Sequence, residues 1–282
     1  MPAEIQGTID VRGHAMAPEA DIRLQYAGGQ IRFTGTAQIP QERYQATLRL
    51  EGFDIARFLP GEQGRLQGQW DVQGSGFAGA TRQASTTMRL EAPTLTLAPN
   101  LDVRLQARLV GDTITLDTMR LQSVPLTFTA AGTLSFSDQV NLSYSVKLGD
   151  LAPLQRRLQT PLQGRGSLQG TVQGTLQALR TQGKLQLMQW RYADWQGERV
   201  QAEWQGTRLL TEPEVTLTVQ VKDVQGPSLP ATDVRLDGQY ARQQGTLKVA
   251  VLDGPFQKTA LEGRLLMGTT PQLTLSRLRL QR

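Results

Sequence analysis

Apolar and polar residues alternate along most of the chain with a period of two residues. In the segment 101–109, for example, Leu101, Val103 and Leu105 are separated by polar residues, and similar segments recur to the end of the sequence. Side chains two residues apart share one face of a β-strand, so each segment has one apolar and one polar face. Gly, Asp, Asn and Pro punctuate the segments, which favours antiparallel hairpins over βαβ units. The pattern predicts an all-β chain that forms an elongated, curved, mostly antiparallel sheet.

Such a sheet carries its apolar residues on one face, and these are the candidate lining of a groove. The alternating apolar positions expected there are Leu95, Leu97, Leu105, Ile114, Leu116, Leu126, Phe128, Leu134, Phe136, Leu142, Tyr144, Val146, Val215, Leu217, Val219, Val221, Leu247 and Val249. A half-apolar sheet either closes over this face or stays open as a trough that an apolar ligand occupies. Alternation by itself leaves both outcomes open.

Two short helices interrupt the predicted strands and belong to a loose repeat. They cover 54–59 and 150–158, and each opens with an Asp that can cap it. The segments 66–74 (LQGQWDVQG) and 162–170 (LQGRGSLQG) repeat 5–13 (IQGTIDVRG), and the offset of 96 residues between the later two carries Asp54 onto Asp150. Repeat units of about 5–65, 66–161 and 162–282 are therefore expected to stack in a single extended array over 1–282.

This layout resembles the TamB/AsmA-like superfamily of bacterial envelope proteins. The resemblance is carried by FDIARFLPGEQGRLQGQWDVQGSG at 53–76 and by GDLAPLQRRLQTPLQGRGSLQGTVQG at 149–174. It implies a β-groove in the periplasm that conveys phospholipid acyl chains between the inner and outer membranes and serves outer-membrane assembly. It also implies that the chain is an internal segment, anchored by a region that it lacks, with inner- and outer-membrane protein partners reached through its missing terminal regions.

Composition narrows the classes of function. The 282 residues contain no cysteine, which excludes a disulfide framework, thiolate zinc sites and a cysteine nucleophile. The net charge of +5 is spread thinly, without the basic stripe interleaved with aromatics that nucleic-acid binders show, so no nucleic-acid partner is expected. No apolar stretch approaches the roughly 20 residues of a membrane span, and the N-terminus lacks the pattern of a signal peptide.

The residue patterns that might carry chemistry do not form a site. The segment 74–79 matches G-x-G-x-x-G, but a dinucleotide site needs an amphipathic helix next, and 80–88 is polar and rich in Thr. His14 is the single histidine, which excludes histidine metal triads and a Ser-His-Asp triad. Glu212 and Glu214 flank Pro213 and are interpreted as a solvated turn. No catalytic residue, cofactor or metal is predicted, and the chain is not expected to be an enzyme.

The four tryptophans leave an alternative open. Trp70, Trp190, Trp195 and Trp204 are expected to pack in a core or at the lip of a groove. Trp190 and Trp195 lie close to Tyr192, which is also the arrangement of a surface that stacks on a saccharide. The second hypothesis is therefore a structural or adhesive β-repeat scaffold that binds a protein or a glycan through its loops.

Overall fold

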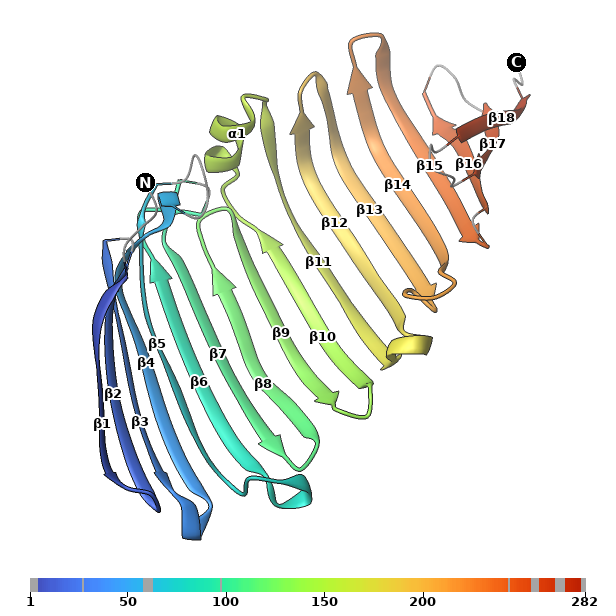
Figure 1. Cartoon of the computed structure of the whole chain (residues 1–282). Coiled ribbons are helices and arrows are strands. Elements are labelled where there is room, and N and C mark those ends of the chain that lie inside the picture. Colours follow the sequence, from blue (N-terminus) through green and yellow to red (C-terminus); the bar gives the residue numbers. More distant parts are fainter. Residues whose placement is uncertain are drawn as a thin grey trace. The chain divides into compact units, whose positions relative to one another are not determined.

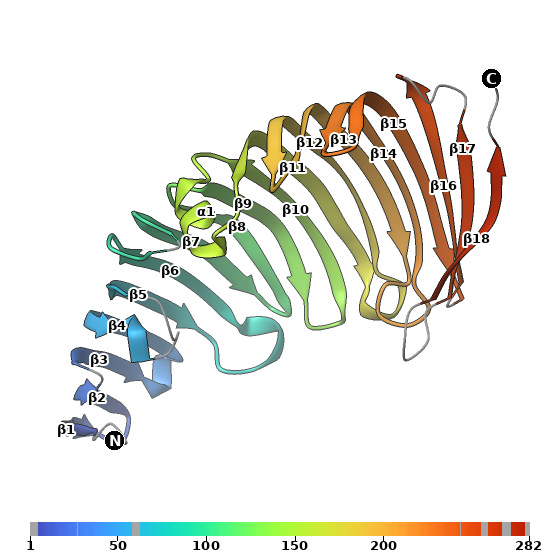
Figure 2. The same cartoon turned by 90° about the horizontal axis from the view of Figure 1, so that it is seen from above.

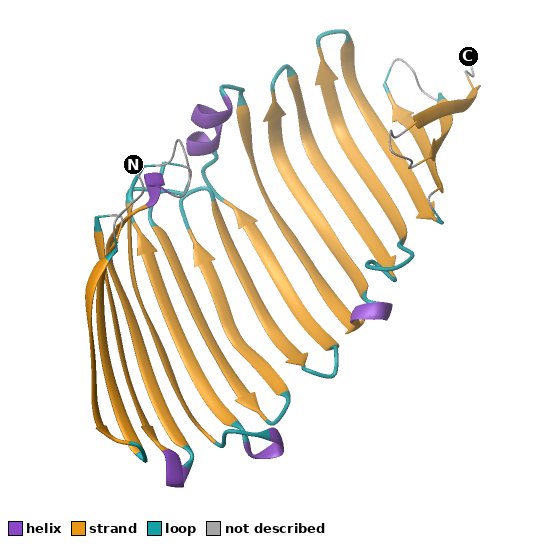
Figure 3. Cartoon of the chain, viewed as in Figure 1, coloured by secondary structure: helices purple, strands orange, loops and turns teal. Residues whose placement is uncertain are grey.

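The computed structural model describes residues 5–26, 28–57, 63–96, 98–242, 244–254, 259–266 and 272–279. The chain divides into two compact units, Met1–Ser137 (unit 1) and Asp138–Arg282 (unit 2). Both units consist almost entirely of β-strands, as Figure 3 shows by colour. The all-β, antiparallel class predicted by the two-residue period is confirmed.

Unit 1 is a meander in which each strand pairs with the next one along the chain. Its strands are β1 (Gln6–His14), β2 (Ala17–Tyr26), β3 (Gly29–Gln38), β4 (Arg43–Asp54), β5 (Arg65–Ser75), β6 (Gln83–Ala92), β7 (Leu101–Val110), β8 (Thr113–Gln122) and β9 (Leu126–Ser135). All eight neighbouring pairs are antiparallel. Within the described residues β1 does not pair with β9, so the sheet of unit 1 is open (Figure 1).

Unit 2 repeats the same topology. Its strands are β10 (Gln139–Leu148), β11 (Leu162–Thr175), β12 (Arg180–Tyr192), β13 (Trp195–Thr207), β14 (Glu214–Gly226), β15 (Leu229–Ala241), β16 (Gln244–Asp253), β17 (Ala260–Leu266) and β18 (Gln272–Arg279). Every consecutive pair is antiparallel. Figure 2 shows these strands as one curved layer, and β10 does not pair with β18 among the described residues.

β-Bulges keep the apolar residues on one face where the strict alternation fails. In β8, Ile114 and Leu116 are followed by Met119 and Leu121, a change of parity that would send the second pair to the polar face. The register with β9 shifts by one residue between Leu116 and Met119, so all four stay on the same face. A similar shift between β11 and β12 lies at Gln163 and Arg165. The bulges therefore keep the apolar side chains on one face where a regular strand would place some of them on the polar face.

The short helices lie where the repeat predicts them. A 3₁₀ helix, η2, covers Ile55–Arg57, and α1 covers Ala152–Leu158, while Phe58 and Leu59 fall outside the described residues. The carboxylate of Asp54 accepts a hydrogen bond from Ala56 N at 3.0 Å, and that of Asp150 accepts one from Ala152 N at 2.9 Å. The two aspartates thus play the same local role 96 residues apart.

The connection 93–100 differs from the sequence prediction. Leu95 lies in this irregular connection and not on a strand, and Leu97 is outside the described residues. Pro93 and Pro99 cannot donate hydrogen bonds to a ladder, and the N–H of Asn100 instead closes onto Pro93 O at 3.0 Å. The two prolines therefore prevent a regular strand here, although Leu and Thr alternate locally.

Ion pairs along and across the strands cover the polar face. In unit 1, Arg23 and Arg32 are directly opposite on β2 and β3, an arrangement of like charges that is unfavourable without an anion. Asp21 provides the anion, because Arg23 and Arg32 both donate to its carboxylate, at 2.8 and 2.9 Å. These hydrogen bonds lower the pKa of Asp21 to about 2. The pairs are exposed, so they arrange the polar face more than they stabilise the fold.

We expect the Arg32→Gln substitution to raise the pKa of Asp21 toward that of an unfolded chain. Because the folded-state pKa is lowered, the stabilising contribution of Asp21 is complete above about pH 3.9, its value in an unfolded chain, and is lost as the pH falls toward 2. A carboxyl titration by NMR measures this directly. Arg43→Gln is the control and should leave Asp21 unchanged; equal titration curves for Asp21 in the parent and Arg32→Gln proteins would contradict the assignment.

Candidate functional site

One uninterrupted row of apolar side chains crosses all nine strands of unit 1. Because each strand pairs with the next in register, residues directly opposite one another form a line across the sheet. This line, the unit 1 row, is Ile9, Ile22, Phe33, Leu48, Trp70, Met88, Leu105, Met119 and Ala130. Strands about 4.8 Å apart give it a length of roughly 38 Å.

Unit 2 has an equivalent row. The unit 2 row crosses β10 to β17 and consists of Val146, Leu168, Leu185, Ala202, Val219, Leu236, Val249 and Leu261. It contains no polar residue, and at a strand spacing of about 4.8 Å it is roughly 34 Å long. The adjacent row on the same face, two residues along each strand, is also largely apolar, so the apolar surface is wider than one side chain.

These rows are not the core of a filled sandwich. In the described residues the buried hydrophobic side chains are few, namely Phe53, Ala92, Ala107, Leu151, Ala202 and Val224. Apart from Ala202, the residues of the unit 2 row are only half-buried. The apolar faces are therefore only partly covered.

Glycines beside the rows, on the same apolar faces, make room for aromatic rings from the neighbouring strand. A Cβ at Gly74 would lie 2.5 Å from the ring of Tyr44, and one at Gly170 would lie 2.6 Å from the hydroxyl of Tyr144. Gly74 and Gly170 are the last residues of the repeated segments 66–74 and 162–170, so a tyrosine lies across the same repeat position in both units. Trp204 lies across Gly183 in the same way. The rings cover backbone that glycine would otherwise leave bare.

Fifteen of the eighteen predicted lining residues lie on the apolar faces. Leu105 is in the unit 1 row, and Val146, Val219 and Val249 are in the unit 2 row. Parallel rows or alternate positions of the same faces hold Ile114, Leu116, Leu126, Phe128, Leu134, Leu142, Tyr144, Val215, Leu217, Val221 and Leu247.

Two of the other predicted lining residues, Leu95 and Phe136, lie elsewhere. Leu95 belongs to the connection between β6 and β7, and Leu97 is outside the described residues. Phe136 follows the last residue of β9 and is 56% exposed, and the guanidinium of Arg82 lies 5.5 Å from the centre of its ring. A cation over the ring face is a favourable surface contact, so Phe136 packs against a charged side chain and not on the apolar face.

Several residues of the rows are not among the predicted lining residues. Some of them stand in strands whose sequence has few alternating apolar residues. Phe33 and Met88 stand in segments with only two large apolar residues at alternate positions. Leu48 and Leu236 were also not selected, although Tyr44, Ala46 and Leu50 alternate with Leu48, and Val234 and Tyr240 alternate with Leu236. Met119 was missed because the bulge in β8 changes the parity. Requiring each apolar residue to face one in the next hairpin strand would have found the first four.

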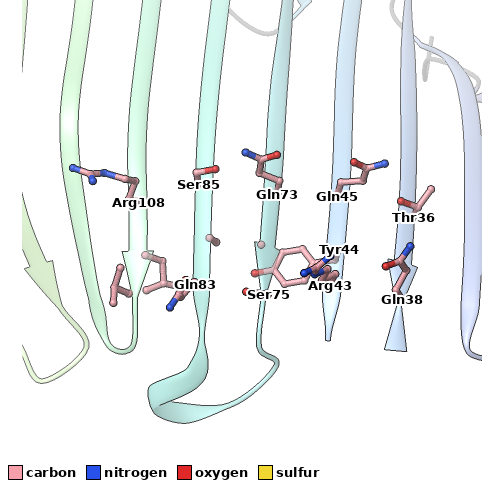
Figure 4. Close-up of a pocket in the computed structure, with 14 residues that line it drawn as sticks. Thr36, Gln38, Arg43, Tyr44, Gln45, Gln73, Ser75, Gln83, Ser85 and Arg108 are labelled. Atoms are coloured by element: carbon pink, nitrogen blue, oxygen red, sulfur yellow. The ribbon is translucent and has the colours of Figure 1, made fainter. Parts of the chain in front are cut away.

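A hollow of about 550 Å³ lies on the other face of unit 1. Thr36, Gln45, Gln73, Ser85 and Arg108 form one cross-strand row along it, as Figure 4 shows. Small Ser and Thr side chains between long Gln and Arg side chains create the depression. Hydroxyl, amide and guanidinium groups suit water or a polar ligand, and Tyr44, Gly74, Ala84 and Leu109, at apolar-face positions, also border the hollow.

The other candidate residues occupy surface positions. His14 is exposed at the end of β1, and Arg208 pairs with both Glu212 and Glu214 at the start of β14. The segment 74–79 leads into a three-residue 3₁₀ helix, Gly79–Thr81, and then into β6. In the part of the chain that the structure describes, no three His, Asp or Glu side chains are grouped as metal ligands.

The chain was compared with protein families, curated proteins and solved structures. The family model described as TamB, N-terminal domain, matches residues 8–281. No curated protein and no solved structure matches the chain. None of the described helices has both the length and the apolar character needed to cross a membrane. With nearly the whole chain matched, this protein belongs to the TamB N-terminal domain family.

Proposed function

We propose that the apolar faces of this protein convey phospholipid acyl chains between the inner and outer membranes. Membership of the TamB family suggests a role in lipid or protein transport in the cell envelope, and domains of this family are not known enzymes. One observation supports the finer proposal: each of the two sheets carries one uninterrupted row of apolar side chains that is only partly covered by other residues.

Burial of an acyl chain is the physical gain that the rows offer. A dozen methylenes gain on the order of 10 kcal/mol when they leave water, at about 0.8 kcal/mol each. An open apolar face in water is unfavourable, so protein and lipid both benefit from the contact. Because adjacent positions of a row are equally apolar, a chain can move along it without crossing a polar barrier, whereas an isolated pocket would hold it in place.

Photo-crosslinking in cells tests the proposal. We expect a crosslinker incorporated at Phe128, Leu217 or Val219 to capture phospholipid, because these residues lie on the apolar faces. Mass spectrometry of the adducts identifies the lipid. The matched positions are Thr129 and Gln220, which neighbour Phe128 and Val219 along the same strands but point to the polar face.

Lipid adducts at the apolar positions only would support the proposal. Adducts with protein alone would favour the second hypothesis, a scaffold that binds a partner. Equal lipid capture on both faces would indicate contact with a bilayer surface. It would contradict a lipid path confined to the apolar face.

A further inference from the structure

Most charged side chains on the polar face of unit 1 have a partner within the sheet. Asp102 accepts Arg104 at 2.8 Å, for example, and Asp71 accepts the hydroxyl of Thr47 at 2.7 Å. The hollow of Figure 4 differs from the rest of this face. It is lined by four glutamines, Gln38, Gln45, Gln73 and Gln83. Within the described residues none of these four side chains forms a hydrogen bond, so their amides are available to a ligand.

Short side chains form the floor of this hollow. Ser75 on β5 is directly opposite both Arg43 on β4 and Gln83 on β6, so a long side chain stands on each side of a short one. In the next row Ser85 on β6 lies in the same way beside Gln73 on β5. The hydroxyls therefore lie at the bottom of the hollow, and the amide and guanidinium groups form its walls.

A second hollow, of about 380 Å³, continues the first one along the strands. The two hollows share Gln45, Gln73 and Ser85, and the second one extends to Asp71 on β5. Together they form the polar depression, which covers three successive rows of side chains on β3 to β6. With rows about 6.8 Å apart and strands about 4.8 Å apart, the polar depression extends about 14 Å in each direction.

The groups that face the polar depression suit a ligand rich in hydroxyls. A glutamine amide presents a donor and an acceptor in one plane, and a hydroxyl can act as either. Neighbouring hydroxyls of a sugar ring offer the same combination, so one amide can bind two of them. Gln45 and Gln73 are directly opposite each other at the centre of this surface. An acyl chain would be unfavourable there, because it would cover the amides without replacing their hydrogen bonds to water.

The charges at the two ends of the polar depression restrict the ligand further. Arg43 lines one end and has no carboxylate partner among the described residues, whereas Arg108 nearby is held by Asp117 at 2.8 Å. Asp71 lines the other end, about 14 Å away, because Arg43 is opposite Ser75, four residues from Asp71 on β5. One free guanidinium fits one carboxylate or phosphate group. The carboxylate of Asp71 accepts hydroxyls but repels a second anion, so a polyanion such as a nucleic acid does not fit.

We propose that the polar depression of unit 1 binds a saccharide that carries one anionic group. Arg43 binds the anionic group, Gln45 and Gln73 bind ring hydroxyls at the centre, and Asp71 accepts hydroxyls of the sugar farthest from Arg43. The site lies on the face opposite the unit 1 row. The inference therefore goes beyond the lipid path of the proposed function and does not depend on it.

Isothermal titration calorimetry of the full chain with two disaccharides tests the inference. One is chitobiose, which is neutral, and the other joins glucuronic acid to N-acetylglucosamine. The full chain should bind the glucuronate disaccharide more tightly than chitobiose. Gln45→Met/Gln73→Met, which keeps the length of both side chains but removes their amides, should weaken binding of both disaccharides about tenfold. Arg43→Gln should bring the ratio of the two affinities close to one and remove the salt dependence of glucuronate binding.

Gln25→Met/Gln30→Met is the matched control. These two glutamines are also exposed and directly opposite on the polar face, on β2 and β3, but lie outside the polar depression. The control should bind both disaccharides as the parent does, and equal urea midpoints exclude unfolding as a cause. Equal weakening in the two double variants, or no saturable binding by the parent, would overturn the inference. Lipid capture at Phe128 tests the proposed function separately and should be the same in the parent and in Gln45→Met/Gln73→Met.

Discussion

Aspartate at Leu168, Leu185 and Val219 together should abolish phospholipid binding by unit 2. The three positions belong to the unit 2 row on β11, β12 and β14. An acyl chain lying on the row would bury each carboxylate against hydrocarbon, at a cost of several kcal/mol per charge. Three such costs exceed the roughly 10 kcal/mol that a dozen methylenes gain. Lipid that co-purifies with the chain, measured by mass spectrometry, should fall at least tenfold.

The same strands supply a closely matched control for this variant. Ser167, Gln186 and Gln220 each neighbour one of the three replaced residues and face the polar side. Aspartates at these three positions add the same charge to the same strands, so they should leave the bound lipid unchanged. Loss of lipid in both triple variants would show that the added charge reduces lipid binding by disturbing the fold or by long-range repulsion. It would remove the support for acyl chains bound along the apolar face.

A single aspartate should act weakly. At Leu185 alone, the cost of burying one carboxylate is smaller than the roughly 10 kcal/mol that a dozen methylenes gain, so binding stays favourable. We therefore expect most of the co-purifying lipid to remain. The contrast between one and three substitutions is what a continuous surface predicts, whereas a single binding pocket would lose its ligand after one substitution.

Alanine at Gly170 should destabilise unit 2 by about 1–3 kcal/mol, the usual cost of forcing extra atoms into an occupied space. Its Cβ would lie 2.6 Å from the hydroxyl of Tyr144 and 2.6 Å from the carbonyl oxygen of Gln182. The tyrosine can move, but the carbonyl belongs to the neighbouring strand and cannot move without disturbing the ladder. The midpoint of urea unfolding should fall accordingly.

Gly238 is the matched control for Gly170. It also lies within a strand of unit 2 on the apolar face, and its nearest neighbour would be Leu217, 3.8 Å from the new Cβ. Alanine there should be neutral or stabilising by up to about 1 kcal/mol, because the unfolded chain loses conformational freedom. Equal midpoints for the two variants would mean that the aromatic–glycine contact has no energetic importance. Gly74→Ala should behave like Gly170→Ala, since its Cβ would meet the ring of Tyr44.

The local pattern predicted most of the strands, because the two faces of a strand differ by one residue and the hydrophobic effect acts on that difference directly. Leu105, Val146 and Val219 were placed on the apolar face from alternation alone. The repeat was equally local: Asp54 and Asp150 each bind the N–H two residues ahead, an interaction set by neighbours in the chain.

Sequence thus determined that this protein would be a long succession of two-faced antiparallel strands with capped turns at fixed places. The tertiary structure alone decided the rest, because register, bulges and coverage depend on which strands become neighbours. The strand register aligns Phe33, Leu48 and Met88, which are far apart in the sequence, in one row. The bulge in β12 places Tyr192 on the apolar face and Arg191 on the polar face. Whether the apolar face would be covered was also decided there, since no single strand encodes the absence of a second layer above it.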